Sequence, residues 1–124
     1  MKRSLTLLFL SVACAVCQGE ELLKNQGFES GSFAGWTQRG QGWSIDKERF
    51  SEGERSALCT VGKGDKPALR ACVQKIKGVA AGKIVEVSVD ISASNVARTP
   101  NSKACLAVLC FDANGQVLKE YRSN

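Results

Sequence analysis

The residues best suited to chemistry lie in a glycine-rich stretch, GFESGSFAGWTQRGQGW, at positions 27–43. It holds two tryptophans, Trp36 and Trp43. Exposing the large apolar side chain of tryptophan to water is unfavourable, so each is expected to pack or to bind a ligand. Two interpretations of Trp43 stay open. It begins the next strand as a core residue, or it offers a flat face for stacking on a sugar ring. In the second case Arg39 and Gln41 are close enough in sequence to hydrogen-bond sugar hydroxyls.

Candidates for catalysis are few. The chain has no histidine, so its cysteines have no imidazole base for nucleophilic catalysis. Glu52 and Glu54 form the closest pair of acids, but a glycosidase holds its two acids on opposite sides of a bond within a deep cleft. A small β domain can hardly build such a cleft, and no phosphate loop or dinucleotide fingerprint occurs. The sequence therefore predicts that this protein is not an enzyme.

The N-terminal segment, residues 1–19, has the pattern of a secretory signal peptide. Lys2 and Arg3 precede an uncharged apolar run over residues 5–17. Small residues make cleavage after Ala15, Cys17 or Gly19 equally open. The run is short of the roughly 20 apolar residues of a membrane-spanning helix. A weak lipobox, SVAC, leaves lipoprotein anchoring as a minor alternative. The predicted location is secreted, periplasmic or at the cell surface.

Residues 20–124 are expected to form one small domain without a transmembrane segment. Two of the 17 basic residues and none of the 12 acidic residues lie in the leader, so this part carries a net charge of +3. The basic residues are spread among apolar ones rather than gathered in a block. Nucleic acid is therefore not an expected partner.

Four cysteines remain beyond the leader: Cys59, Cys72, Cys105 and Cys110. They form either disulfides, with three possible connectivities, or small buried thiols. A hairpin centred on residues 65–66 would place Cys59 opposite Cys72. A bridge between Cys105 and Cys110 is disfavoured, because five positions along one strand turn two side chains to opposite faces. Without histidine or a Cys-x-x-Cys pair in residues 20–124, zinc is also disfavoured.

Nearly every segment beyond the leader has the character of a β-strand bounded by turn residues. The clearest alternation, KIVEVSVDIS, puts Val85, Val87 and Val89 on one face and Glu86 and Ser88 on the other. Regular strands with short turns predict an all-β, antiparallel sandwich or barrel. The expected strands cover residues 42–45, 56–61, 68–76, 83–93, 104–111 and 116–121.

Four motifs occur in a recognisable order: LLKNQGFESGSFAGW, EGERSALCTV, VQKIKGVAAGKIVEVSVDISA and LAVLCFDANGQVL. In this order they resemble the carbohydrate-binding modules of families four, nine and twenty-two, over residues 21–121. The last turn departs from the family pattern, with Ala81 where proline is usual. The resemblance implies a galactose-binding-like β-jelly roll. It also implies that residues 20–124 are C-terminally incomplete and lack the last strands of that fold.

The resemblance also implies a function and a set of site residues. It implies non-catalytic binding of polysaccharide, in a module once or still attached to a glycoside hydrolase, with Trp36 as a structural tryptophan. A structural calcium ion would be held by the carboxylates of Glu29 and Glu52 and the carbonyls of Gly27 and Arg55. These are oxygen ligands of the kind calcium requires. A structural or adhesion β-sandwich without sugar binding is the alternative, because one fold can host both functions.

Overall fold

The regular secondary structure in the described part of the chain consists of antiparallel β-strands. The computed structural model describes residues 6–17, 19–66, 68–80, 82–94 and 104–123. Within these ranges no helix is found, and none that could span a membrane. The strands are β1 (Thr6–Cys17), β2 (Glu20–Glu21), β3 (Thr37–Arg39), β4 (Trp43–Asp46), β5 (Ser56–Val61), β6 (Ala71–Val73), β7 (Val85–Ser94), β8 (Ala107–Phe111) and β9 (Val117–Arg122). For these residues, the prediction of all-β structure is confirmed.

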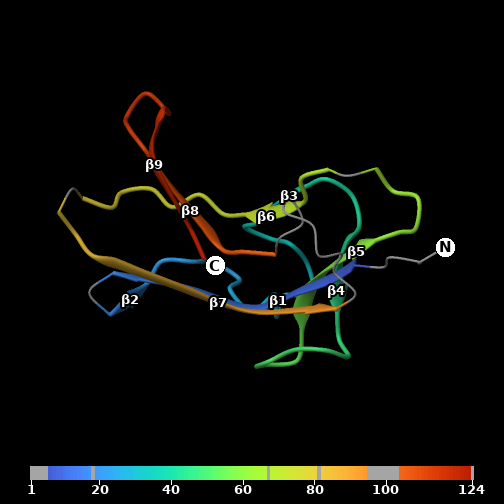
Figure 1. Cartoon of the computed structure of the whole chain (residues 1–124). Helices are drawn as coiled ribbons and strands as arrows, with labels where there is room; N and C mark the ends of the chain where they lie inside the picture. Colours follow the sequence, from blue (N-terminus) through green and yellow to red (C-terminus); the bar gives the residue numbers. More distant parts are fainter. Residues whose placement is uncertain (1–5, 18, 67, 81, 95–103, 124) are drawn as a thin grey trace.

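The largest sheet has β1 in its interior. Its hydrogen-bonded order is β2-β1-β5-β4, and β7 pairs with the other edge of β1 (Figure 1). β5 faces the first half of β1, with Leu8 opposite Cys59, while β7 pairs along nearly its whole length, from Leu7 opposite Ser94 to Cys17 opposite Val85. The predicted leader thus supplies the strand that joins β5 to β7. Lys2 and Arg3, its basic start, lie outside the described residues.

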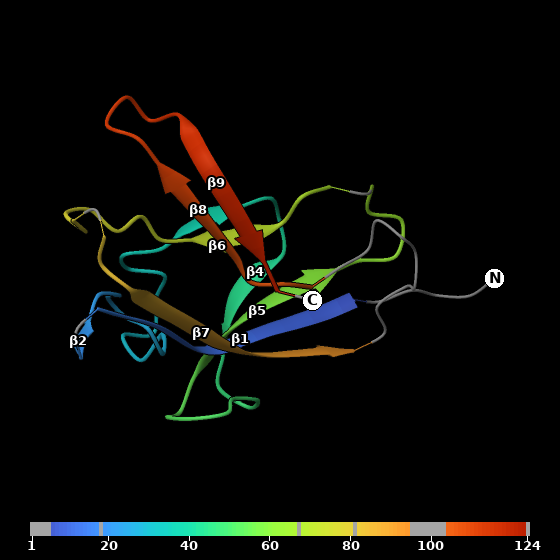
Figure 2. The ribbon, with the colours of Figure 1, turned by 60° about the vertical axis from the view of Figure 1, so that its left-hand side comes forward.

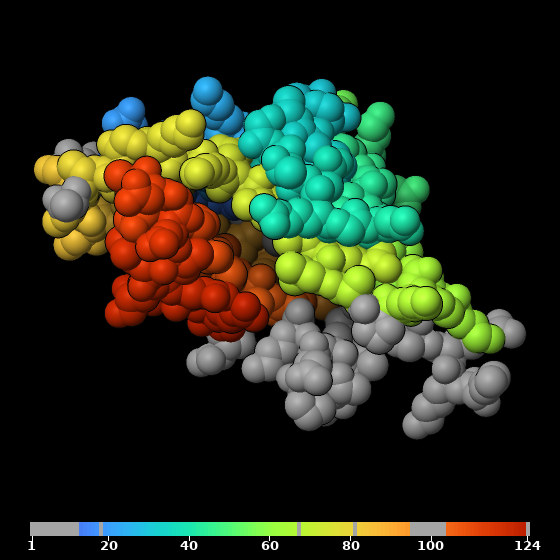
Figure 3. Space-filling model, turned by 90° about the horizontal axis from the view of Figure 1, so that it is seen from above, coloured from blue at the N-terminus to red at the C-terminus, as the bar shows by residue number. Residues whose placement is uncertain are grey.

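Two smaller sheets complete the architecture. β3 pairs with β6, and β8 pairs with β9 as a hairpin. In both ribbon views these two sheets lie on the same side of the larger sheet, and the tip of the hairpin projects outward (Figures 1 and 2). Seen from above, the surface is hollowed between the red β8–β9 hairpin and the cyan and green segments (Figure 3).

The pairing of β6 shows that the hairpin considered at residues 65–66 does not form. Cys59, in β5, lies opposite Trp43 of β4, whereas Cys72, in β6, lies opposite Gln38 of β3. All six cysteines are free thiols. The connection between β5 and β6 instead carries Arg70, whose guanidinium donates to the carbonyl of Thr60 at 3.3 Å. This side-chain contact holds the two strands together without a backbone ladder between them.

Strand β7 has the alternation that its sequence predicts. Val85, Val87 and Val89 are half-buried, and Glu86 and Ser88 between them are exposed. Strand β5 has the predicted bounds, residues 56–61. By contrast, the strand predicted over residues 68–76 is reduced to the three residues of β6, because β3, its only ladder partner among the described strands, is itself three residues long.

The core is small and lies around β5 and the loop that precedes β3. Phe28 and Ala57 have no exposed surface, and Cys59 is 2% exposed. On β1, Ala13 and Ala15 are buried as well. Ser56 is also fully buried, and its hydroxyl donates to the carbonyl of Arg49 at 2.5 Å, which satisfies its hydrogen-bonding requirement.

Candidate functional site

An aromatic cluster forms where the glycine-rich stretch folds onto the large sheet. The ring of Phe28 lies 5.2 Å from that of Trp36 and 5.8 Å from that of Phe33, centroid to centroid. Phe33 in turn makes an edge contact with Trp43 at 6.4 Å. Such tilted and edge-on geometries are favourable for aromatic rings beyond the area they bury. The cluster therefore links the loop to the first residue of β4.

The loop is wound tightly around Asn25. This residue and Phe28 have φ angles of 48° and 58°, which are rare for residues other than glycine. The Asn25 side-chain amide donates to the carbonyls of Ser32 and Ala34, at 2.9 and 3.1 Å. Asparagine is among the few residues with a side chain that tolerate this conformation. At Phe28, the burial of the side chain offsets the backbone strain.

Both tryptophans donate their indole N–H within the protein. Nε1 of Trp36 donates to the carbonyl of Asn25 at 2.9 Å, inside the loop. Nε1 of Trp43 donates to the carbonyl of Arg39 at 3.1 Å. Trp43 remains half-buried, so its ring is fixed at one edge and still reaches solvent. Trp43 therefore begins β4 as a half-buried residue, and stacking of its ring on a sugar stays a prediction.

The other two predicted sugar contacts flank Trp43 along the chain. Arg39 ends β3, and Gln41 precedes Gly42 in the turn to β4; both side chains are exposed. The backbone of Gln41 is held firmly, because its carbonyl accepts from the Arg70 guanidinium at 2.5 Å. Gly42 has a φ of 95°, and a Cβ there would collide with the carbonyl of Thr60. The turn therefore requires glycine and holds its polar side chains at the surface.

The predicted calcium residues meet partly in space. Glu29 approaches the loop before β5, where its Oε1 accepts the backbone N–H groups of Glu54 at 2.9 Å and Arg55 at 3.2 Å. The guanidinium of Arg55 lies against Gly31. The described residues hold no group of three or more His, Cys, Asp and Glu side chains arranged for a metal. Calcium here would rely on Glu29 Oε2, Glu52 and backbone carbonyls such as that of Gly27.

Sequence reasoning did not identify a second polar and aromatic surface. A hollow of about 450 Å³ lies between the β4–β5 connection and β7. The Phe50 ring is 44% exposed there, and Ser51 donates its hydroxyl to Asp90 Oδ2 at 2.8 Å. The complete lining is Glu48, Arg49, Phe50, Ser51, Asp90, Ile91 and Ser92. The only available signal was an aromatic residue in a polar turn, which did not reveal that β7 lies beside it.

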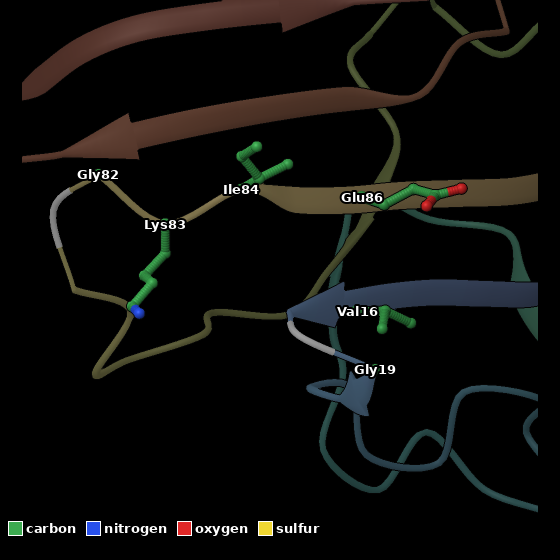
Figure 4. A pocket seen from close by; sticks show the side chains of 6 residues that line it. All are labelled: Val16, Gly19, Gly82, Lys83, Ile84 and Glu86. Atoms are coloured by element: carbon green, nitrogen blue, oxygen red, sulfur yellow. The ribbon is translucent and has the colours of Figure 1, made fainter.

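Another hollow, of about 470 Å³, lies where β1 turns into β2, and it has fewer features of a binding site. It lies beside Val16, Gly19, Lys83 and Glu86 (Figure 4). In the close view Val16 and Ile84 point in opposite directions, and Lys83 lies apart from Glu86. The polar groups do not converge, so this surface has no arrangement that would select a ligand.

The turn that follows β1 is organised by one carboxylate. Oε1 of Glu21 accepts the backbone N–H groups of Ala15 and Leu23, and Oε2 accepts the thiol of Cys14 at 2.9 Å. Burial raises the pKa of Glu21, but the hydrogen bonds from Cys14 and the backbone outweigh it and leave the pKa lowered. The same contact with Glu21 raises the pKa of the Cys14 thiol. The carboxylate therefore stabilises the end of β1 in its charged form.

Burial favours the protonated form of two thiols, Cys59 opposite Trp43 and Cys72 opposite Gln38. It raises the pKa of Cys59, with Arg70 acting in the opposite direction, and it raises the pKa of Cys72 to about 12. Because the thiolate is the reactive form of cysteine, these two residues have the properties of packing groups. They offer no nucleophile beside the candidate site.

Comparison with known proteins adds no family. No protein-family model matches the sequence, no curated protein matches it, and no solved structure matches the fold.

Proposed function

We propose that the protein is an exported, non-catalytic carbohydrate-binding module of the β-sandwich, jelly-roll type. The observation that carries the proposal is the setting of Trp43, which is fixed by its hydrogen bond to Arg39 and by Phe33 yet remains partly open. A rigid aromatic surface loses little conformational entropy on stacking against a sugar ring. The exposed side chains of Arg39 and Gln41 lie beside it in sequence and supply hydrogen-bond donors for hydroxyl groups.

The Phe50 hollow is a second position for the same ligand class. Its exposed ring has carboxylate, guanidinium and hydroxyl groups around it, which is the mixture that polysaccharide recognition uses. Isothermal titration of the full chain with soluble β-glucan, xylan and galactan oligosaccharides tests both positions. We expect saturable binding that Trp43→Ala weakens at least tenfold, on the order of 1.4 kcal/mol, with Phe111→Ala as an aromatic control.

The titrations distinguish which position binds sugar from whether the protein binds sugar at all. Loss of binding in Phe50→Ala but not in Trp43→Ala would move the site to the hollow. No binding by a folded, monodisperse wild-type protein would contradict the proposal. It would favour the alternative, a structural or adhesion module, for which the exposed Leu109, Val117 and Leu118 of the β8–β9 hairpin are available as apolar contact residues.

Calcium is proposed as a structural ion at Glu29, Glu52 and the carbonyls of Gly27 and Arg55. An ion bound only by the folded state raises the melting temperature, and the rise grows with the free ion concentration relative to its Kd. Thermal unfolding with calcium and with a chelator is the test. We expect calcium to raise the melting temperature in the wild type but not in Glu29→Gln. Identical melting temperatures in the wild type with and without calcium would contradict the ion.

A further inference from the structure

Strand β1 lies in the interior of the large sheet, between β5 and β7. It pairs antiparallel with both β5 and β7, so those two strands run parallel to each other. Neighbouring strands lie about 4.8 Å apart, which puts β5 and β7 roughly 9–10 Å apart across β1. Without β1, both strands would expose a row of unpaired N–H and C=O groups.

The second half of β1 pairs with β7 on one edge, and on the other edge it is held by β2 and by contacts outside any ladder. Ala13 donates its N–H to the carbonyl of Gln26 at 3.1 Å, and Ala15 donates to Glu21 Oε1 at 3.1 Å. The carbonyl of Ala15 accepts from Leu22 at 2.6 Å. Segment 20–26 and β7 thus form the two walls of a slot around residues 13–17.

Two alternate positions of this segment carry small, buried side chains. Ala13 is 8% exposed and Ala15 is 1% exposed. Both point to the same face of β1, because alternate residues of a strand share a face. Cys14 and Val16, on the opposite face, are only half-buried. The Ala-x-Ala pattern that suits a signal peptidase is therefore also the pattern that fits the sheet.

From this geometry we propose that the groove between β5 and β7, together with segment 20–26, is a strand-acceptor site. Its occupant in the mature protein is an apolar, uncharged β-strand donated by another exported polypeptide, antiparallel to β5 and β7, with small residues where Ala13 and Ala15 lie. The proposal rests on the predicted export and removal of residues 1–19. Addition of a strand to open sheet edges is an established mode of peptide recognition, and β1 itself shows the register.

The test uses the full chain with a site-specific protease sequence inserted after Gly19. A Cβ at Gly19 would meet nothing within 4 Å, so the turn has room for an insertion. The folded chain is cut under reducing conditions and then exposed to a labelled peptide of residues 6–17. We expect the cut leader to stay bound during size-exclusion chromatography and to exchange with the labelled peptide. The uncut chain, whose groove is filled, serves as the control and should bind none.

Peptide variants test the selectivity of the slot. A peptide with Ala13→Leu and Ala15→Leu should bind at least tenfold more weakly than the unchanged peptide. The matched control, Val16→Leu, enlarges a side chain that lies beside an open surface hollow and should bind about as well. Equal binding of all three peptides would contradict the proposed selectivity.

Three further outcomes would overturn the proposal. A cut chain that releases the leader and remains a stable monomer would show that β5 and β7 close on each other. A cut chain that dimerises and excludes the peptide would assign the groove to a second copy. Hydrogen exchange on the uninserted wild type gives an independent measurement, since rapid exchange throughout β5 and β7 would show that β1 does not pair with them. Sequencing the N-terminus of the exported protein tests cleavage separately, and sugar titration is independent of both.

Discussion

The aromatic loop (residues 25–36) and the β8–β9 hairpin are ordered in opposite ways. The loop contains no strand, yet Phe28 is fully buried and Asn25 ties the backbone at both ends. The hairpin has a regular ladder and a well-formed turn, in which Asp112 accepts the N–H groups of Asn114 and Gln116, but every residue of β9 is exposed. Regular secondary structure and burial are therefore separate sources of order in this chain.

Contacts within the hairpin are local and lie near solvent. Arg122 pairs with Glu120, and the Lys119 ammonium lies 4.9 Å from the Tyr121 ring centroid. Exposed ion pairs and cation–π contacts contribute at most about 1 kcal/mol each. One longer-range contact, from Lys75 to the Phe111 ring at 5.5 Å, joins the hairpin to the segment after β6. We therefore expect the hairpin to open more readily than the loop.

Thiol labelling should give the largest difference between the buried and exposed regions. Cys110, in β8, is exposed, whereas Cys59 is 2% exposed and a higher pKa reduces its thiolate. If Cys59 reacts only after global opening at a cost of about 5 kcal/mol, its labelling should be on the order of 10³-fold slower or more. Iodoacetamide labelling of the reduced protein, followed by peptide mass spectrometry, measures both rates. Similar rates in the folded protein, with denatured protein as reference, would contradict the comparison.

Deletion of an aromatic ring should distinguish the two regions in stability. Phe28→Ala leaves a cavity under the loop, and such a change costs about 3–5 kcal/mol. Phe111→Ala removes a ring that is 45% exposed and should cost about 1 kcal/mol or less. Urea unfolding followed by tryptophan fluorescence measures both. Equal losses would show that the hairpin is covered as thoroughly as the loop.

The strands were more predictable than their partners. Alternation in residues 85–91 identified the buried face of β7, because a half-buried strand has apolar residues at every second position. The bounds of β5 also followed from sequence. The pairing of β6 did not, since the length between Cys59 and Cys72 suggested a hairpin, whereas the structure pairs β6 with β3. Pairing depends on contacts distant in sequence, such as that of Arg70 with Gln41.

The candidate site was predictable in its residue types but not in its geometry. Arg39, Gln41 and Trp43 are near one another because they are close in the chain, and the structure adds the Trp43 hydrogen bond that fixes the ring. The surface around Phe50 was missed because it requires Asp90 from a strand about 40 residues away. Likewise, the apolar run of residues 5–17 satisfies the pattern of a leader and that of a buried strand, and periodicity cannot distinguish the two.

The charge of Glu21 should make the stability of the end of β1 depend on pH. Because its folded pKa is lowered from 4.5, its contribution to stability is present above pH 4.5 and is lost as pH falls through the folded value. The end of β1 should therefore loosen in acid before the hairpin does. Hydrogen exchange of residues 13–17 and 117–122 between pH 3 and pH 6, corrected for intrinsic rates, measures this. Glu21→Gln should flatten the dependence, with the exposed Glu20→Gln as a charge-matched control.

Substitution at the hairpin surface should have the smallest effect on stability. Leu118 is 68% exposed, and Leu118→Thr replaces it with a residue that favours strands. We expect unfolding free energy to change by less than about 0.5 kcal/mol, as measured by urea denaturation at two protein concentrations. A loss above about 1.5 kcal/mol at both concentrations would show that Leu118 packs within its own chain. A loss confined to the higher concentration would show that a second molecule covers it, and the exposed hairpin would then be a self-association surface.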